Sequence, residues 1–240
     1  MRIAIVSDVH GNLTALEAVL ADLKLTSPDL VLHGGDLAHG GSSPTEVVDK
    51  IRELGWPGVC GNTDEILWAP EALTAFAAKA PKLQSLLAAI AAMLPHECAQ
   101  LGEERIAWLK SLPMVERRGT LALVHAGAND LWRSPMLEST DAEMTEAYRS
   151  LNAALVVYGH IHRPFIRQLP DMTVANSGSV SMSYDGDTRA SYLLVDDGKP
   201  SIRRVAYDLE REAAALLRSG LPHAEWICRI LRAGGYVPPE

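Results

Sequence analysis

Short apolar segments alternate with amphipathic ones over the first part of the chain. Residues 2–7 form a β-branched apolar run that ends in polar side chains, which predicts a buried strand. Asn12 then precedes apolar positions that recur every three or four residues, the pattern of an N-capped amphipathic helix. A strand at 30–32, a helix from Pro44 to residue 54 and a strand at 59–60 continue the alternation. This βαβαβ order predicts parallel strands with helices on their faces.

The pattern changes between residues 65 and 112, where alanine- and leucine-rich helix formers predominate and no strand is evident. We expect a helical cap insertion over residues 65–114, placed over a cleft. Four prolines are expected to separate its helices: Pro70, Pro81, Pro95 and Pro113.

Strand patterns return in the second half, with short connections that favour hairpins. They lie at residues 121–124, 154–158, 165–169, 173–175, 192–195 and 202–206. One helix is expected at about 141–151, and a C-terminal helical tail of two short helices over 208–240. No internal repeat or low-complexity linker divides the chain. We therefore predict one α/β domain over residues 1–240, with two packed mixed β-sheets flanked by helices.

The composition narrows the classes of function. Hydrophobic residues make up 48% of the 240 residues and charged residues 22%, which excludes wholesale disorder. The 22 Lys and Arg residues against 30 Asp and Glu residues give a net charge of −8. That balance argues against an extended nucleic-acid-binding surface, but it is compatible with a small phosphate ligand held by a few groups.

Neither a membrane span nor an export signal is evident. The longest purely apolar run, residues 86–94, is much shorter than the roughly 20 residues that cross a bilayer. The residues after Met1 lack the order of a signal peptide. Cys60, Cys98 and Cys228 are widely spaced, which predicts neither a disulfide framework nor a thiolate metal site. We expect a cytoplasmic protein without membrane contact.

Polar side chains cluster where the predicted strands end. Asp8 and His10 alternate after the first strand, as do His160 and His162 after a later one. Asp36, Asn62 and His125 each follow another strand. Because ligands of open α/β sheets gather at the carboxyl ends of strands, we expect these seven side chains to meet at one rim.

The donor set predicts a metal centre. Carboxylates, imidazoles and an amide oxygen, without a thiolate, suit a pair of divalent cations rather than a structural zinc. Mn²⁺ or Fe is the first expectation, with Zn²⁺, Ni²⁺ and Mg²⁺ as alternatives. Two such cations against Asp8 and Asp36 leave a charge of about +2, which would recruit a phosphate to an acidic protein.

Five segments in order resemble the calcineurin-like metallophosphoesterases, and most closely their small bacterial and archaeal phosphodiesterase branch. The segments are Asp8-Val9-His10-Gly11-Asn12, Gly35-Asp36, Gly61-Asn62-Thr63-Asp64, His125 and Gly159-His160-Ile161-His162. Each segment alone carries little weight, whereas five in order over residues 8–162 are specific.

The resemblance implies a ligand set and a reaction. Asp8, His10 and His162 would hold one metal, and Asp36 would bridge to the second. The second metal would be held by Asn62, His125 and His160. A hydroxide bridging the metals and held by Asp36 would attack phosphorus in line with the leaving oxygen.

One position departs from the family pattern. The commonest third motif of the family is Gly-Asn-His-Asp/Glu, in which the histidine contacts phosphate and protonates the leaving group. Thr63 occupies that position here, and a hydroxyl is not acidic enough for the task, which is typically worth about 10²–10⁴-fold in rate. We therefore assign no side-chain general acid. His39, three residues after Asp36, is a candidate replacement donor at the same rim.

Each residue that is a candidate for contacting the substrate could instead have a purely structural role. The candidates are Asn12, His39, Thr63, Asp64 and Arg163. Asn12 reads first as a helix cap, Asp64 equally as a turn residue, and Arg163 as an exposed arginine. His33, inside a predicted strand, is expected to be a core residue.

The sequence thus predicts a metal-dependent phosphoesterase that hydrolyses phosphodiesters. The partner would be a small phosphorylated substrate, either a nucleotide or another phosphodiester, and homo-oligomerisation stays open. One alternative is a non-catalytic metal-binding scaffold of the same fold, which would not need all seven ligands. A phosphomonoesterase or protein phosphatase is the other, and the missing histidine at Thr63 argues against it.

Overall fold

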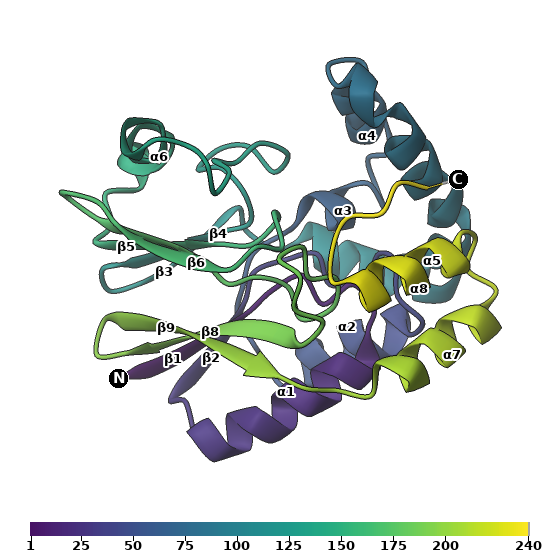
Figure 1. Ribbon diagram of the computed structural model, residues 1–240, viewed down its shortest axis with the longest axis horizontal. Helices are drawn as coiled ribbons and strands as arrows, with labels where there is room; N and C mark the ends of the chain where they lie inside the picture. The colour runs from purple at the N-terminus through teal and green to yellow at the C-terminus, as the bar shows by residue number, and fades with distance from the viewer. Residues whose placement is uncertain (240) are drawn as a thin grey trace.

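The computed structural model describes residues 1–239, in which two β-sheets lie face to face with helices outside them (Figure 1). One described sheet has the order β2-β1-β8-β9, built from Leu30–His33, Arg2–Val6, Ala190–Asp196 and Lys199–Val205. The other has the order β3-β4-β5-β7-β6, built from Val115–Arg118, Leu121–Val124, Leu155–Tyr158, Thr173–Asn176 and Phe165–Gln168. Both sheets contain parallel and antiparallel pairs, which confirms the predicted mixed sandwich.

Helices cover the outer faces of both sheets. The described α-helices are α1 (Leu13–Thr26), α2 (Pro44–Glu53), α3 (Asn62–Glu65), α4 (Glu71–Ala77), α5 (Gln84–Lys110), α6 (Asp141–Tyr148), α7 (Leu209–Ser219) and α8 (Ala224–Ala233). Short 3₁₀ turns at Pro81–Leu83 (η1) and Arg149–Leu151 (η2) precede α5 and follow α6. In Figure 1, α6 lies over the β3–β7 sheet, while α8 runs beside α5 at the other end of the molecule.

The strands are apolar on both faces, because each sheet packs against the other sheet on one side and against helices on the other. In β1, Ile3 and Ile5 point between the sheets, and Ala4 and Val6 point toward α1 and α2. β4 follows the same rule, with Leu123 between the sheets. This double burial explains why the strands read as continuous apolar runs.

Two strand predictions are wrong. The strand expected at 59–60 is reduced to an isolated bridge between Gly58 and His33. Conversely, β3 (Val115–Arg118) was not predicted, because its Val-Glu-Arg-Arg sequence is mostly charged. It pairs with β4 alone at the edge of its sheet, where charged side chains reach solvent.

The second half is less hairpin-like than expected. β6–β7 and β8–β9 are antiparallel pairs, as short connections predict, but β4–β5 and β5–β7 are parallel. Parallel pairing here brings the carboxyl ends of β4 and β5 to the same edge, which is where the candidate ligands follow.

The segment from 65 to 114 is helical over α4, η1 and α5, but Pro95 does not separate helices. α5 continues through it, and the backbone leaves the helical conformation at Gly102 instead, with φ of 67°. Gly102 tolerates that angle because it has no Cβ. The predicted tail 208–240 holds α7 and α8; its last residue, Glu240, lies outside the described residues.

Among residues 1–239, no helix combines the length and the apolar character that crossing a bilayer demands.

Candidate metal centre

The seven predicted ligands come together at one end of the sandwich. Asp8 and His10 follow β1, Asp36 follows β2, and Asn62 begins α3. His125 follows β4, and His160 and His162 follow β5. Six of them lie in the loops at the carboxyl ends of strands, as predicted, whereas Asn62 is the first residue of α3 and follows the isolated bridge at Gly58.

Five of these seven residues have left-handed backbone conformation, at φ between 49° and 66°. They are Asp8, His10, Asp36, His160 and His162. Non-glycine residues adopt this region rarely and at a cost of about 1–3 kcal/mol each. Such a concentration of strain is typical of positions where function fixes the direction of a side chain.

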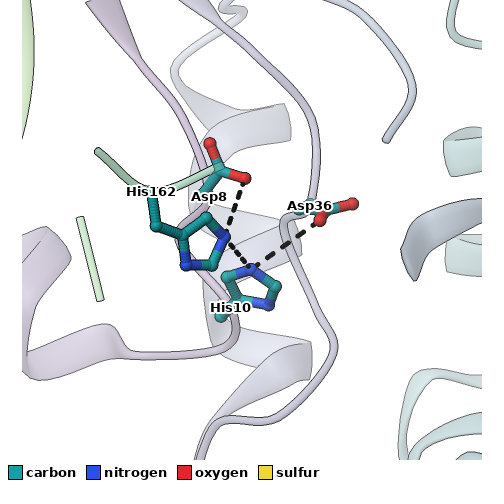
Figure 2. Close-up of side chains that lie close together, drawn as sticks. All are labelled: Asp8, His10, Asp36 and His162. Atoms are coloured by element: carbon teal, nitrogen blue, oxygen red, sulfur yellow. Dashed lines mark hydrogen bonds and ion pairs between the residues drawn. The ribbon is translucent and has the colours of Figure 1, made fainter. Parts of the chain in front are cut away.

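Four side chains form the first half of the cluster (Figure 2), and one ligand atom from each lies within 4.8 Å of the others. His162 Nε2 lies 3.2 Å from Asp8 Oδ1 and 3.2 Å from His10 Nε2. His10 Nε2 in turn lies 3.7 Å from Asp36 Oδ2.

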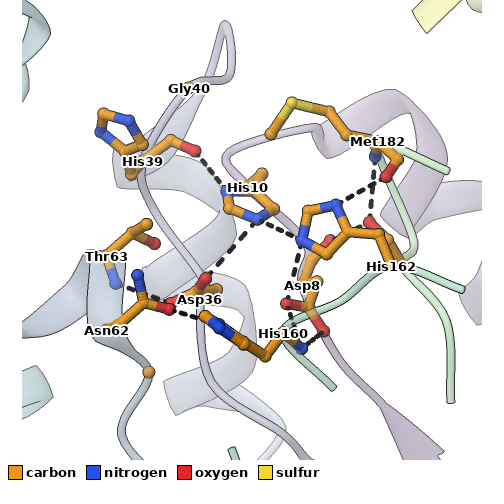
Figure 3. A network of polar contacts seen from close by, with 12 residues as sticks. Asp8, His10, Asp36, His39, Gly40, Asn62, Thr63, His160, His162 and Met182 are labelled. Carbon is orange, nitrogen blue, oxygen red and sulfur yellow. Dashed lines mark hydrogen bonds and ion pairs between the residues drawn. The ribbon is translucent and has the colours of Figure 1, made fainter. Parts of the chain in front are cut away.

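The second half shares Asp36. Asp36 Oδ2 lies 3.4 Å from His125 Nε2, and Asn62 Oδ1 lies 2.9 Å from the same nitrogen. His160 Nδ1 also lies 2.9 Å from Asn62 Oδ1 (Figure 3). Asp36 therefore stands between two groups of donors.

Backbone carbonyls fix the orientation of three histidine rings. His10 Nδ1 lies 2.7 Å from the carbonyl oxygen of His39, and His162 Nδ1 lies 2.6 Å from that of Met182. His125 Nδ1 lies 2.8 Å from the carbonyl oxygen of Gly34. Because a carbonyl oxygen only accepts, each Nδ1 carries a proton, and the lone pair of the neutral ring lies on Nε2. Metal-binding histidines are oriented in this manner.

The orientation directs two imidazole nitrogens to the same point at the centre of the cluster. The Nε2 atoms of His10 and His162 face each other at 3.2 Å, while their Nδ1 atoms face backbone carbonyls. When both rings are neutral, their Nε2 lone pairs can bind the same cation. The donor set, of oxygen and imidazole nitrogen only, fits a divalent transition-metal ion.

The carboxylates are held ionised. Burial raises the pKa of Asp36, but His125 and His10 outweigh it and hold the pKa well below its usual value. For Asp8, burial is likewise opposed by His162 and His125, and the pKa is lowered. Asp8 also accepts hydrogen bonds from the Ser7 hydroxyl and the His160 backbone N–H. Both carboxylates are therefore available as anionic ligands.

The imidazoles divide into two groups. Burial lowers the pKa of His10 and of His160 to about 4, so these rings are neutral near pH 7. Burial also lowers the pKa of His125, but Asp36 and Asp8 outweigh it and raise the value to about 9. The environment of His125 Nε2 thus favours positive charge.

Two of the five candidate substrate residues line the cavity beside the cluster, namely His39 and Thr63. The other three are engaged elsewhere. Asn12 caps α1 by accepting from the Ala15 N–H, and Asp64 accepts from the backbone N–H groups of Asp36, Leu37 and Gly61. Arg163 pairs with Glu138 at 2.8 Å. Asn12 therefore has the observed role of a helix cap, while Asp64 holds the backbone at Asp36 and so supports a candidate ligand.

Sequence reasoning missed two contributors. Glu97 of α5 is buried and lies 2.7 Å from His39, and a lone carboxylate among apolar helix positions was the available signal. α8 lines the cavity through Trp226, Ile227 and Ile230. Their spacing marks one apolar helix face, but nothing local in the sequence says what that face covers.

The chain is similar to proteins of one family. The sequence profile of the calcineurin-like phosphoesterase superfamily domain matches residues 1–198. An uncharacterized protein of Methanocaldococcus jannaschii is 28% identical over 248 residues, covering 94% of this chain and 95% of that protein. A metallophosphoesterase from Sphaerobacter thermophilus has a similar crystal structure, with a TM-score of 0.79, 27% identity, and coverage of 98% of this chain and 100% of that one. The symmetrical bis(5′-nucleosyl)-tetraphosphatase of Methylococcus capsulatus is 30% identical over 137 residues, which are 56% of this chain and 46% of that protein.

Proposed function

The chain belongs to the calcineurin-like phosphoesterase superfamily, and from this membership and the geometry of the cluster we propose that it hydrolyses phosphodiesters with two divalent cations. The observation that carries the proposal is the pair of inward-facing Nε2 atoms of His10 and His162. Their Nδ1 atoms face backbone carbonyls, which leaves both Nε2 atoms available to a cation when the rings are neutral.

The proposed ligands fall on the two sides of Asp36. Asp8, His10 and His162 would hold one cation, and Asn62, His125 and His160 the other. Asp36 would bridge, since its Oδ2 lies within 3.7 Å of His10 Nε2 and 3.4 Å of His125 Nε2. Mn²⁺ or Fe is the proposed metal, with Zn²⁺, Ni²⁺ and Mg²⁺ as alternatives, and donors that are all oxygen or imidazole nitrogen are compatible with each of them.

When bound, the cations would activate water and neutralise the phosphoryl oxygens. The surrounding residues would orient the ester. The His39 ring lines the cavity, and its Nδ1 lies against Glu97. Burial lowers the pKa of His39, but Glu97 outweighs it and raises the pKa, and in the protonated ring Nε2 would donate a hydrogen bond to a phosphoryl oxygen. Thr63 Oγ1 is buried without a hydrogen-bond partner among the described residues, so it too is available to a substrate.

A diester is the proposed substrate rather than a monoester. With Thr63 where the family commonly has histidine, no assigned side chain protonates the leaving oxygen. A nucleotide is one candidate substrate, since a relative of part of the chain is named for nucleoside tetraphosphate hydrolysis. The proposed compartment is the cytoplasm, which the three free cysteines support.

The test strips the protein of metal, reloads it with one metal at a time, and measures bound metal and hydrolysis together. We expect about two ions per chain and faster hydrolysis of bis(p-nitrophenyl) phosphate than of p-nitrophenyl phosphate. Faster monoester hydrolysis would replace the diester proposal by a phosphomonoesterase. Stoichiometric metal without hydrolysis of either ester would favour the scaffold, and no bound metal would end the proposal.

A further inference from the structure

A cavity of about 170 Å³ adjoins the metal-ligand cluster. Its polar end is formed by cluster residues together with His39 and Thr63. The opposite walls are apolar and come from two helices that are distant in sequence. They are Leu86, Ile90 and Met93 of α5, and Trp226, Ile227 and Ile230 of α8. Met182 and Tyr184 complete the lining. One end of the cavity can therefore bind an anion, and the other offers mostly apolar surface.

The side chains that form the apolar walls are mostly buried and closely packed. Met93, Trp226, Ile227 and Ile230 are all buried and belong to one packed cluster that joins α5, α7 and α8. The Trp226 Nε1–H donates to the carbonyl oxygen of Val237 at 2.7 Å, so the polar edge of the indole is already used. What these side chains offer to a ligand is apolar surface.

Among the described residues that line the cavity, none is a lysine or an arginine. The two arginines nearest in sequence to its walls are engaged elsewhere, since Arg163 pairs with Glu138 and Arg229 lines a different groove. A second phosphate between the walls of α5 and α8 would therefore have neither a lysine nor an arginine beside it. Phosphate groups in proteins are normally met by arginine or lysine, and a buried anion without a partner is costly.

The size of the cavity sets a second limit. An apolar cavity of about 150 Å³ accepts a benzene molecule, and the cavity here must admit the phosphoryl group as well, so its apolar part has room for about one ring or a short alkyl chain. A nucleoside, with a base and a ribose, is larger and would extend from the open side of the cavity into solvent, where the walls of α5 and α8 do not contact it.

We propose that the cavity holds one organic substituent of the phosphoester, that this substituent is a small aryl or short alkyl group, and that such esters are preferred over the nucleotide named above as one candidate substrate. This proposal rests on the proposed function, because the phosphoryl group must lie at the metal-ligand cluster. The apolar walls of α5 and α8 then select the substrate by burying the substituent.

The test is calorimetric binding to the metal-loaded protein of ligands that cannot be hydrolysed. Phenylphosphonate and methylphosphonate carry the same charge and differ by the ring. Because burial of a ring is favourable, we expect phenylphosphonate to bind at least about tenfold more tightly. Adenosine 5′-(α,β-methylene)diphosphate should bind more weakly than phenylphosphonate. Equal affinity for the two phosphonates, or tightest binding of the diphosphate analogue, would overturn the proposal.

Two neighbouring leucines of α5 give a matched pair of variants. Leu86 lines the cavity, whereas Leu87 is buried in the main core and lies beside α4. Leu86→Ala should reduce the affinity difference between phenylphosphonate and methylphosphonate and should allow a naphthyl analogue to bind. Leu87→Ala should change neither the affinity difference nor the binding of the naphthyl analogue. If neither leucine changes the preference, the α5 wall does not select the substituent. If the Leu86 variant does not fold, the comparison of the three ligands on the unmodified protein still tests whether the cavity prefers a small apolar substituent.

Failure of this inference is distinct from failure of the proposed function. A protein that hydrolyses the model diester but binds both phosphonates equally retains its function and loses the selective cavity. A protein that neither binds a phosphonate nor hydrolyses the diester loses both.

Discussion

His39 Nδ1 lies 2.7 Å from Glu97 Oε2, and both side chains are buried. Glu97 also accepts the Gly40 N–H through Oε1 at 2.7 Å. The carbonyl of His39 in turn orients His10. α5 is thus joined by one carboxylate to the loop that supports the metal-ligand cluster.

Breaking this pair should destabilise the protein. Because removing one partner of a buried ion pair leaves the other unpaired, we expect Glu97→Gln and His39→Gln each to lower the free energy of unfolding by about 3 kcal/mol. The double variant should lose about 1–3 kcal/mol less than the sum of the two. Urea denaturation measures all three, with exposed Glu103→Gln on the same helix as control. Additive losses would show that the two residues are not coupled.

Asp36→Asn should remove metal and activity together. Its Oδ2 is the oxygen shared by the two halves of the cluster, and an amide is a weaker ligand than a carboxylate. Substituting residues that only hydrogen-bond to metal ligands lowers metal affinity or activity about 10–100-fold. For Asp36 itself we therefore expect the rate of diester hydrolysis to fall by more than about 100-fold. Elemental analysis and diester hydrolysis should fall in parallel, while the exposed Asp171→Asn behaves as the unmodified protein. Full metal content in the Asp36→Asn variant would show that Asp36 does not bridge two cations.

Thr63→His should accelerate poor substrates selectively. Without a side-chain acid, the rate should decline steeply as the pKa of the leaving alcohol rises. A histidine at this position would donate a proton to the leaving oxygen, an effect typically worth up to about 10²–10⁴-fold. The measurement is kcat for a series of aryl and alkyl esters, and Thr63→Ser is the control that keeps the hydroxyl. If the unmodified protein shows equal rates across the series, the reasoning from Thr63 is wrong.

His33 should make stability depend on pH. Burial lowers its pKa to about 3 from an ordinary value of 6.5, and neither ring nitrogen has a hydrogen-bond partner among the described residues. Between these two pH values the unfolded chain binds a proton at His33 that the folded chain does not. Stability therefore falls as the pH is lowered, by up to about 1.4 kcal/mol per pH unit from this group.

His33→Leu tests that dependence directly. Relative to the unmodified protein, its free energy of unfolding should rise progressively as the pH is lowered from about 6 to 4. Exposed His223→Asn is the control variant and should show no such trend. Parallel stability curves for His33→Leu and the unmodified protein would contradict the assignment.

The position of the seven candidate ligands was predictable because each follows a strand or begins a helix. Strand ends can be recognised locally, and the rule that parallel strands present their ends at one edge supplies the long-range step. Their roles as ligands remain proposals. The sandwich itself was predictable for a similar reason, since doubly buried strands have a strong apolar signature.

What the sequence did not predict depends on contacts between distant segments. The charged strand β3 is stable only because β4 lies beside it. Glu97 looks like a surface residue until the loop carrying His39 is placed against α5. The wall that α8 adds to the cavity joins segments more than 110 residues apart, and no periodicity encodes that.

The left-handed backbone at five of the seven cluster positions narrows which amino acids can occupy them. Glutamate and cysteine are competent metal ligands, yet aspartate, asparagine and histidine are the non-glycine types that adopt this conformation most readily. Each such position must therefore satisfy the backbone and the cation at once. Fewer amino acids can therefore replace these ligands than coordination chemistry alone would permit. Changing the metal by changing its ligands would first require loops with a different backbone conformation.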